Sequence, residues 1–299
     1  MNAGIWIEGD IVPINPLLIF QRMCIAKESE KELEMFFTYE LAKFPLSLFK
    51  DDDMPECVKS SMYMGFAQHS GDINFGDTMY VIDEGHLLHP GLWPHGESCS
   101  YICINYVTYL RSKYTTNAVI LFDGYPEDVA KRSTKYAERS RRSRKTASVD
   151  RLFDETLIPS VPQNKFLGND ANKDRLIRML TTKFEAENFM VKQATEDADT
   201  QIFNTSMSVS SAFDSVIVAG EDVDLLIILT ATRSNVYIFK PGKGQISQQI
   251  YSTKSILYKT AADHILSLHA FSCCDATCAL FNQGKMKFIN VLRKIPNFN

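Results

Sequence analysis

The sequence feature that most constrains the fold is a set of three short apolar runs, each followed by acidic residues. Strands that are apolar throughout are typical of a sheet buried on both faces, and the helical patterns between these runs predict parallel βα units. In open α/β sheets, sites lie at the carboxyl ends of the strands, so the acids are expected at one edge. The runs and their acids are 78–82 with Asp83, 118–122 with Asp123, and 214–220 with Asp222 and Asp224.

Two longer segments predict the helices that connect these strands. Residues 99–113 and 170–184 carry apolar side chains at helical spacing. A further helical segment is expected to open at Asp197-Ala198-Asp199 and to run to about Ser206. The pattern predicts an α/β fold with a mostly parallel central sheet.

Composition and cysteine usage restrict the class of protein. Of the 299 residues, 45% are hydrophobic and 23% charged, which is ordinary for a folded soluble chain and excludes wholesale disorder. No apolar run approaches the roughly 20 residues of a membrane-spanning helix, and residues 223–231, which contain Asp224, are interpreted as a buried strand. Neither a signal peptide nor paired CxxC motifs are visible, so we expect free thiols and an intracellular protein without membrane contact. We also expect a nuclear location.

The N-terminal part of the chain has a different character from the rest. Residues 30–42 show helical spacing, and Pro45 ends the run. We therefore predict two regions, an N-terminal helical extension over residues 1–77 and an α/β domain over residues 78–299.

The acids are more informative as a set than singly. An Asp after a strand is commonly a turn residue or a helix cap, and each of these acids alone is best explained that way. Two unit charges ~4 Å apart repel by about 4 kcal/mol at an effective dielectric near 20, so several carboxylates at one edge call for cations. One or two Mg²⁺ or Mn²⁺ ions would suit such hard oxygen ligands. A pair of such ions is typical of enzymes that hydrolyse phosphodiesters. The candidate ligands and catalytic acids are Asp83, Asp123, Asp197, Asp199, Asp222 and Asp224.

Basic charge is concentrated in one segment. Eight Lys and Arg residues and one Glu give residues 131–145 a net charge of +7, which leaves −11 for the rest of a chain whose total is −4. The segment lacks an apolar stripe, so it is expected to be an exposed helix or a loop that contacts an anionic partner; a solvated helix face or a nuclear-import signal is the alternative. The candidate phosphate contacts are Lys131, Lys135, Arg139 and Arg142.

The acids stand in motifs whose order resembles the flap-endonuclease (XPG-like) branch of PIN-like nucleases, over about residues 78–290. A first acid ends a strand, a second lies in a Phe-Asp-Gly motif before a basic arch, and acid-Ala-acid, Glu-Asp-x-Asp and Gly-Cys-Asp motifs follow. The matching residues are Val81-Ile82-Asp83, Phe122-Asp123-Gly124, Asp197-Ala198-Asp199, Glu221-Asp222-Val223-Asp224 and Cys273-Cys274-Asp275.

This resemblance implies a three-layer α/β/α PIN-like fold and a structure-specific nuclease. It adds Asp275 as a seventh metal ligand and implies two divalent ions that activate water. The implied partner is nucleic acid, DNA in preference to RNA, cut at branched or single-stranded ends.

The chain also departs from the family pattern. Asp197 and Asp199 are one methylene shorter than the usual Glu, a cysteine replaces the glycine before Asp275, and the C-terminal helical hairpin is expected to be truncated. The alternative function is a nuclease-derived module, of transposon descent, that binds nucleic acid or protein without cutting.

Other candidate sites are weaker. His86-x-x-His89 is interpreted as a surface or supporting pair rather than a metal pair, because no further ligands stand nearby at a known spacing. Cys273, Cys274 and Cys278 are interpreted as buried thiols rather than a zinc site. An ordinary nucleotide-binding α/β protein is disfavoured because the chain lacks a glycine-rich phosphate loop.

Overall fold

The structure is a computed structural model, and the chain in it divides into two compact units. The larger unit comprises Met62–Leu266, and the smaller comprises Met1–Ser61 with Ser267–Asn297. The structure describes residues 3–7, 10–27, 29–36, 38, 59–70, 77–88, 92–114, 117–125, 148–195, 197–232, 234–242, 245–272 and 284–294.

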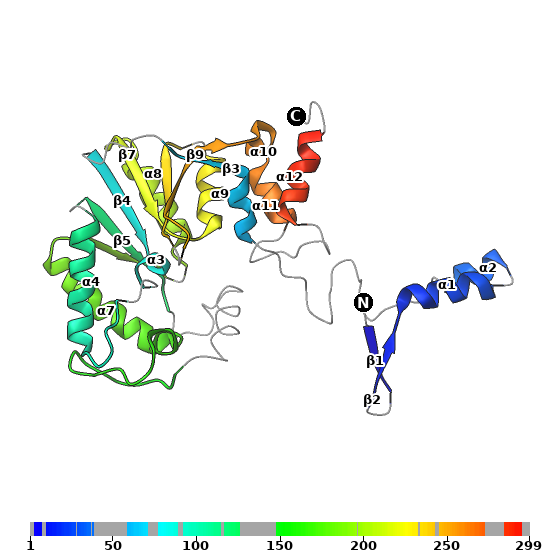
Figure 1. Ribbon diagram of the computed structural model, residues 1–299, viewed down its shortest axis with the longest axis horizontal. Helices are drawn as coiled ribbons and strands as arrows, with labels where there is room; N and C mark the ends of the chain where they lie inside the picture. The colour runs from blue at the N-terminus through cyan, green and yellow to red at the C-terminus, as the bar shows by residue number, and fades with distance from the viewer. Residues whose placement is uncertain are drawn as a thin grey trace. The chain divides into compact units, whose positions relative to one another are not determined.

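The larger unit is built on a seven-stranded sheet with the order β3-β9-β8-β7-β4-β5-β6 (Figure 1). The five strands β8, β7, β4, β5 and β6 are parallel to one another. Strand β9 runs antiparallel to both β8 and β3. The predicted mostly parallel sheet is therefore confirmed. The strands are β3 (Phe66–Gln68), β4 (Thr78–Asp83), β5 (Ala118–Phe122), β6 (Met190–Gln193), β7 (Ser215–Ala219), β8 (Val236–Lys240) and β9 (Gln249–Ile256).

Helices cover both faces of this sheet. Ile82, Ile120 and Phe122 pack into one core cluster with α4 and α7, whereas the adjacent Val81, Val119 and Leu121 are buried outside that cluster, as the period of two in a strand requires. On the other face α8 contacts β4 and β7, and α9 packs against α8 and β9. Figure 1 shows α4 and α7 lying together on one side of the strands. The helices of this unit are α3 (Glu84–Leu88), α4 (Cys99–Lys113), α6 (Gln163–Leu167), α7 (Asp170–Ala186), α8 (Asp199–Val209), α9 (Val223–Ala231) and α10 (Lys259–Asp263).

The predicted crossover helices are confirmed. Helix α4 has the predicted bounds, and Ser98 caps it by accepting a hydrogen bond from the amide of Tyr101 at 3.3 Å. Helix α7 begins where predicted and ends two residues later, with Asn169 as its N-cap.

The interpretation of residues 223–231 as a strand was wrong, because they form helix α9. The Asp222 carboxylate caps the helix by accepting from the amide of Asp224 at 2.9 Å. The segment is apolar nearly all round because it is buried on most sides, and a short buried helix then has the same uniform pattern as a buried strand.

In the smaller unit, β1 (Ala3–Ile7) and β2 (Asp10–Ile14) form an antiparallel hairpin, followed by α1 (Pro16–Ala26) and α2 (Glu30–Phe36). The predicted helix over residues 30–42 is found as far as Phe36; Thr38 lies in a turn, and residues 37 and 39–42 lie outside the described residues. The strands of the hairpin were not predicted. The boundary at residue 78 stays a prediction, and β3, which precedes it, pairs with β9 in the main sheet.

Two further helices complete the described chain. The boundary between the two units falls within helix α11 (Ile265–Phe271), after Leu266. Helix α12 (Lys285–Lys294) belongs to the smaller unit. None of the helices in the described ranges combines the length and the apolar character needed to cross a membrane.

Candidate functional site

The carboxyl ends of β5, β4 and β7 bring three of the predicted acids to one edge of the sheet. Asp83 is the last residue of β4, the strand that lies between β5 and β7 and runs parallel to both. Asp123 follows β5 directly, and Asp222 lies three residues beyond the end of β7. A Cβ placed on Gly220 would lie 3.4 Å from the Cβ of Asp83, so a glycine lets the end of β7 pass close to this carboxylate.

A direct hydrogen bond joins the second acid to the acid-Ala-acid motif. The Asp123 Oδ1 accepts from the amide of Ala198 at 2.9 Å, and Ala198 is the N-cap residue of α8. Asp199 is the first residue of α8, and Asp197 immediately precedes the cap. The motif therefore lies beside the end of β5, and its carboxylates stand at the positive end of a helix dipole.

The Glu-Asp-x-Asp motif, residues 221–224, lies at the start of helix α9. Asp222 is the N-cap of α9 and Asp224 lies in its first turn, where the helix dipole again favours negative charge. The hydroxyl of Tyr63 donates to the carbonyl oxygen of Glu221 at 3.3 Å and so ties this turn to the segment that precedes β3. Burial raises the pKa of Tyr63, and the charges of Asp222 and other nearby groups raise it further.

Burial and the charges of the neighbouring acids raise the pKa of Asp83. Burial holds the pKa of the Asp83 carboxyl well above its usual range, and the charges of Asp123, Glu84, Asp199 and Asp222 act in the same direction. These contributions come from four separate elements, the ends of β4, β5 and β7 and the start of α8. A concentration of carboxylates of this kind is the electrostatic condition that a bound cation relieves.

The Phe-Asp-Gly motif has a steric reason for its glycine. A Cβ on Gly124 would lie 2.3 Å from the carbonyl oxygens of Ala194 and Thr195. This backbone is held in place by the amide of Ala194, which donates to the carbonyl oxygen of Phe122 at 2.9 Å. Only glycine therefore allows the chain after β6 to pass over the end of β5, where Asp123 stands.

Only solved structures, and these at low identity, match the chain. No protein-family model matches the sequence, and no curated protein matches it. Among the solved structures that match the chain, three with TM-scores below 0.5 are given as examples. They are the catalytic core of Rad2 in complex with a DNA substrate, a point mutant of the T5 5′-exonuclease, and human GEN1 in complex with Holliday junction DNA.

The likeness to these structures is distant. The Rad2 core is 17% identical with a TM-score of 0.45, and the match covers 73% of this chain and 61% of that one. The T5 mutant is 12% identical with a TM-score of 0.41, covering 73% and 72% of the two chains. GEN1 is 12% identical with a TM-score of 0.44, covering 75% and 51%. The resemblance to the flap-endonuclease-like (XPG-like) PIN domains rests on the sequence motifs and not on these structures.

Residues that the sequence analysis missed surround Asp123. Glu84, which is only 1% exposed, accepts from the amide of Asp123 at 3.0 Å through Oε2 and from the hydroxyl of Tyr125 at 2.7 Å through Oε1. Lys173 of α7 forms an ion pair with the same Oε1. The one signal in the sequence was that Glu84 directly follows Asp83, which gives a strand end two successive acids.

The donor set fits hard divalent cations, although the carboxylates do not yet converge on one point. Carboxylate oxygens are the ligands that Mg²⁺ and Mn²⁺ prefer. In the part of the chain that the structure describes, no three His, Cys, Asp or Glu side chains come close enough together to share one ion.

His86 is a core residue rather than one of a metal-binding pair. It is 1% exposed, its Nε2 lies 2.7 Å from the hydroxyl of Tyr114, and its ring packs edge-on against Phe239. Burial lowers its pKa to about 4, so the ring is neutral at physiological pH. His89, the other half of the pair, lies outside the described residues.

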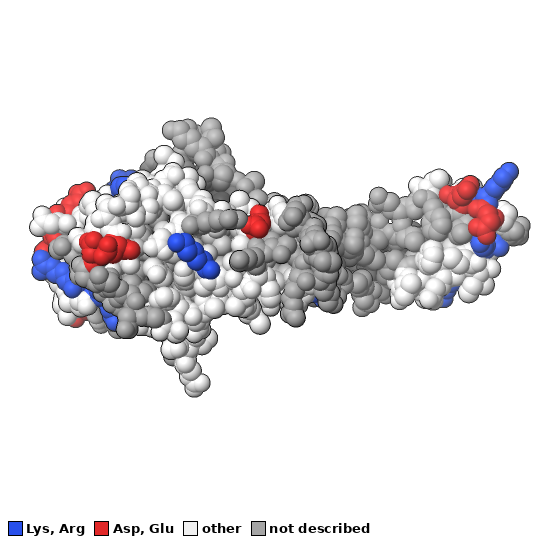
Figure 2. Space-filling view, turned by 90° about the horizontal axis from the view of Figure 1, so that it is seen from above, with Lys and Arg blue, Asp and Glu red and all other residues white. Residues whose placement is uncertain are grey.

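Several predicted site residues lie outside the described part of the chain, namely Lys131, Lys135, Arg139, Arg142 and Asp275, as do Cys273, Cys274 and Cys278. On the face drawn in Figure 2, the described acidic and basic side chains are scattered, and they form no continuous basic patch there.

Proposed function

We propose that the chain is a metal-dependent nuclease that hydrolyses phosphodiester bonds in nucleic acid, DNA in preference to RNA, at branched or single-stranded ends. The observation that carries this proposal is the meeting of acids at one sheet edge. Asp83 and Asp123 end adjacent parallel strands, and the Asp123 carboxylate is bonded to the cap of α8, where Asp199 begins.

The proposed ligands are the predicted acids. Divalent ions, when bound, make water more acidic and stabilise a leaving oxygen, which is the chemistry that hydrolysis of a phosphodiester needs. The chain supplies negative charge from two strand ends and two helix starts, and the peptide dipoles of α8 and α9 offset part of the repulsion among the acids. The ligands we propose are Asp83, Asp123, Asp197, Asp199, Asp222 and Asp224, with Asp275 as a seventh.

The basic segment is the proposed contact for the phosphate backbone. Its charge of +7 within a chain of net −4 is suited to bind an anionic polymer. Lys131, Lys135, Arg139 and Arg142 are the residues that we expect to contact phosphates. A nuclear location remains a prediction.

A nuclease-derived module that binds nucleic acid without cutting is the second candidate. One observation favours it: among the described residues, no three potential ligands are close enough to share an ion. This candidate retains the basic segment and the fold but predicts no cleavage under any metal condition.

The experiment compares the purified chain with the double variant Asp222→Asn/Asp224→Asn on flap, hairpin and single-stranded DNA and on the matching RNAs. With Mg²⁺ or Mn²⁺ the unmodified chain should cleave, EDTA should stop it, and the double variant should not cleave because two ligand charges are gone at constant volume. Asp214→Asn is the control, because it makes the same change at the exposed opposite end of β7 and should cleave normally.

Two results would overturn the proposal. A double variant that cuts at the unmodified rate would place the activity elsewhere. An unmodified chain that binds these nucleic acids but cleaves none of them, with either ion, would establish the binding module instead.

A further inference from the structure

Glu84 is a buried carboxylate whose two oxygens are both engaged. Oε2 accepts from the amide of Asp123, and Oε1 accepts from the hydroxyl of Tyr125 and pairs with the ammonium group of Lys173. The same ammonium group lies 5.2 Å from the centroid of the Tyr125 ring. Three of the roughly four lone-pair directions of this carboxylate are thus used within the protein, and its charge is paired with Lys173, so Glu84 is better suited to a supporting role than to binding an ion.

Asp123 is held at its amide, its carbonyl oxygen and its carboxylate. The amide donates to Glu84 at 3.0 Å, the carbonyl oxygen accepts from Gln193 Nε2 at 3.1 Å, and Oδ1 accepts from the amide of Ala198 at 2.9 Å. Gln193 also donates to Asp174 of α7 at 3.3 Å. The position of this carboxylate is therefore fixed from several elements, and Glu84 holds the backbone from which it projects.

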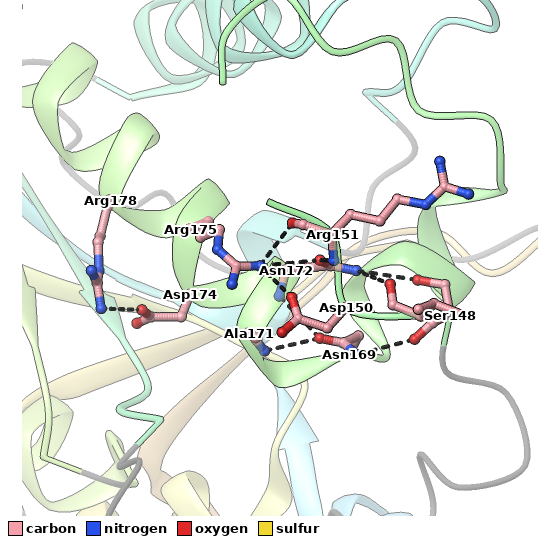
Figure 3. Close-up of polar contacts among 10 residues, drawn as sticks. Ser148, Asp150, Arg151, Asn169, Ala171, Asn172, Asp174, Arg175 and Arg178 are labelled. Atoms are coloured by element: carbon pink, nitrogen blue, oxygen red, sulfur yellow. Dashed lines mark hydrogen bonds and ion pairs between the residues drawn. The ribbon is translucent and has the colours of Figure 1, made fainter. Parts of the chain in front are cut away.

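The first turns of α7 also hold the chain that follows the basic segment (Figure 3). Asn172 accepts from the amide of Arg151 at 2.9 Å and donates to the carbonyl oxygen of Val149 at 3.1 Å, and it is fully buried. Arg175 bonds the Asp150 carboxylate at 2.5 Å. Lys173 lies between Asn172 and Arg175 in the sequence of α7. Tyr125 and Ser148, which border the undescribed residues 126–147, are thus bonded to Glu84 and to Asn172.

We propose that Glu84 and Lys173 are positioning residues of the candidate metal site: they fix Asp123 for a divalent ion and join α7 to the end of β5, without binding the ion themselves. This inference rests on the metal-binding part of the proposed function. Hydrogen-bonding partners behind a metal ligand commonly account for roughly tenfold to 100-fold in metal affinity, because they set the orientation of the ligand. The alternative is an ion pair that only stabilises the fold.

The experiment measures Mn²⁺ binding by calorimetry on the full chain, with thermal unfolding in EDTA beside it. Glu84→Gln and Lys173→Met should each weaken Mn²⁺ binding by roughly tenfold or more. Lys173→Arg keeps a cation for Glu84 and should restore most of the affinity. Lys183→Met is the matched control, because Lys183 lies on the same helix and pairs with the exposed Glu155 instead; its Mn²⁺ affinity should be unchanged.

A second measurement reports on Asp123 itself. Hydrogen exchange over residues 118–125, measured without metal, should be faster in Glu84→Gln because the charged acceptor of the Asp123 amide becomes a neutral, weaker one. Should Glu84→Gln or Lys173→Met fail to fold, Tyr125→Phe removes only one hydroxyl, and it should weaken Mn²⁺ binding in the same direction.

The outcomes separate this inference from the proposed function. Folded Glu84→Gln and Tyr125→Phe variants with unchanged Mn²⁺ affinity would overturn the inference and leave the nuclease proposal standing. An unmodified chain that binds Mn²⁺ but cleaves nothing would overturn the nuclease proposal and leave the inference standing. An unmodified chain that binds no Mn²⁺ would overturn both.

Discussion

At the scale of single residues, the carboxyl of Asp83 is opposed by both burial and the charges of neighbouring acids. It is half-buried at the end of the central strand β4, and four other carboxylates raise its pKa further. A residue under this penalty is retained at a cost in stability, which is typical of functional sites. These two effects predict how the stability of the protein depends on pH.

We expect Asp83→Asn to raise the melting temperature in EDTA at neutral pH. The folded pKa of Asp83 lies above its unfolded value, so ionising it costs stability, and asparagine removes that cost while it can still accept from the amide of Gly85. As the pH falls through the raised folded pKa, the unmodified carboxyl takes up a proton and the advantage of the variant should disappear. Thermal unfolding at several pH values measures this.

The control for this prediction is Asp214→Asn, in which the same change is made on an exposed residue at the other end of β7. Its melting temperature should stay close to that of the unmodified chain at every pH. If Asp83→Asn is less stable than the unmodified chain at neutral pH in EDTA, the acids do not repel one another as described.

At the scale of the elements, the strands that carry the acids and the two long helices could be predicted from local pattern. Continuous apolar runs are informative when they end in polar residues, as at Asp83 and Asp123, but they do not separate a buried strand from a buried helix. Helix α9 was missed for that reason, and its cap, Asp222, was interpreted only as an acid at a strand end. Glu84 was missed because its partners Asp123 and Lys173 are distant in sequence, and only the fold brings them together.

We expect Gly124→Ala to destabilise the larger unit by about 1–3 kcal/mol, the usual cost of overpacking against atoms that cannot move aside. The new methyl group would lie 2.3 Å from backbone atoms of Ala194 and Thr195. The end of β5 would have to shift, so Mn²⁺ affinity should fall as well. Urea unfolding and Mn²⁺ calorimetry measure the two effects.

Gly284→Ala serves as the comparison, because a Cβ there meets no atom within 4 Å. It should change neither stability nor Mn²⁺ affinity noticeably. Equal stability of the two variants would show that the chain does not pass over Gly124 as closely as the structure indicates.

At the scale of the whole molecule, the charge of the chain is divided between an acidic body and one basic segment. We expect neutralising Lys135 and Arg142, as Lys135→Gln/Arg142→Gln, to weaken nucleic-acid binding across sequences. The slope of log affinity against log salt should fall by roughly one to two units, because about two phosphate contacts are lost. Mn²⁺ affinity at the acids should be nearly unchanged, which separates substrate binding from metal binding.

The import-signal interpretation of the same segment predicts a different outcome. It expects the double variant to be mislocalised in cells while its binding in vitro keeps the original salt slope. An unaltered slope would therefore remove Lys135 and Arg142 from the proposed nucleic-acid contacts.

The most direct test of the metal site is anomalous diffraction from crystals of the full chain grown or soaked with Mn²⁺. The account predicts one or two manganese peaks at the carboxyl edge of the sheet, with Asp83, Asp123 and Asp222 among the ligands and Glu84 still bonded to the amide of Asp123. Well-ordered crystals at saturating Mn²⁺ that show no manganese peak at this edge, or that place Asp123 and Asp222 on opposite sides of the sheet, would contradict it.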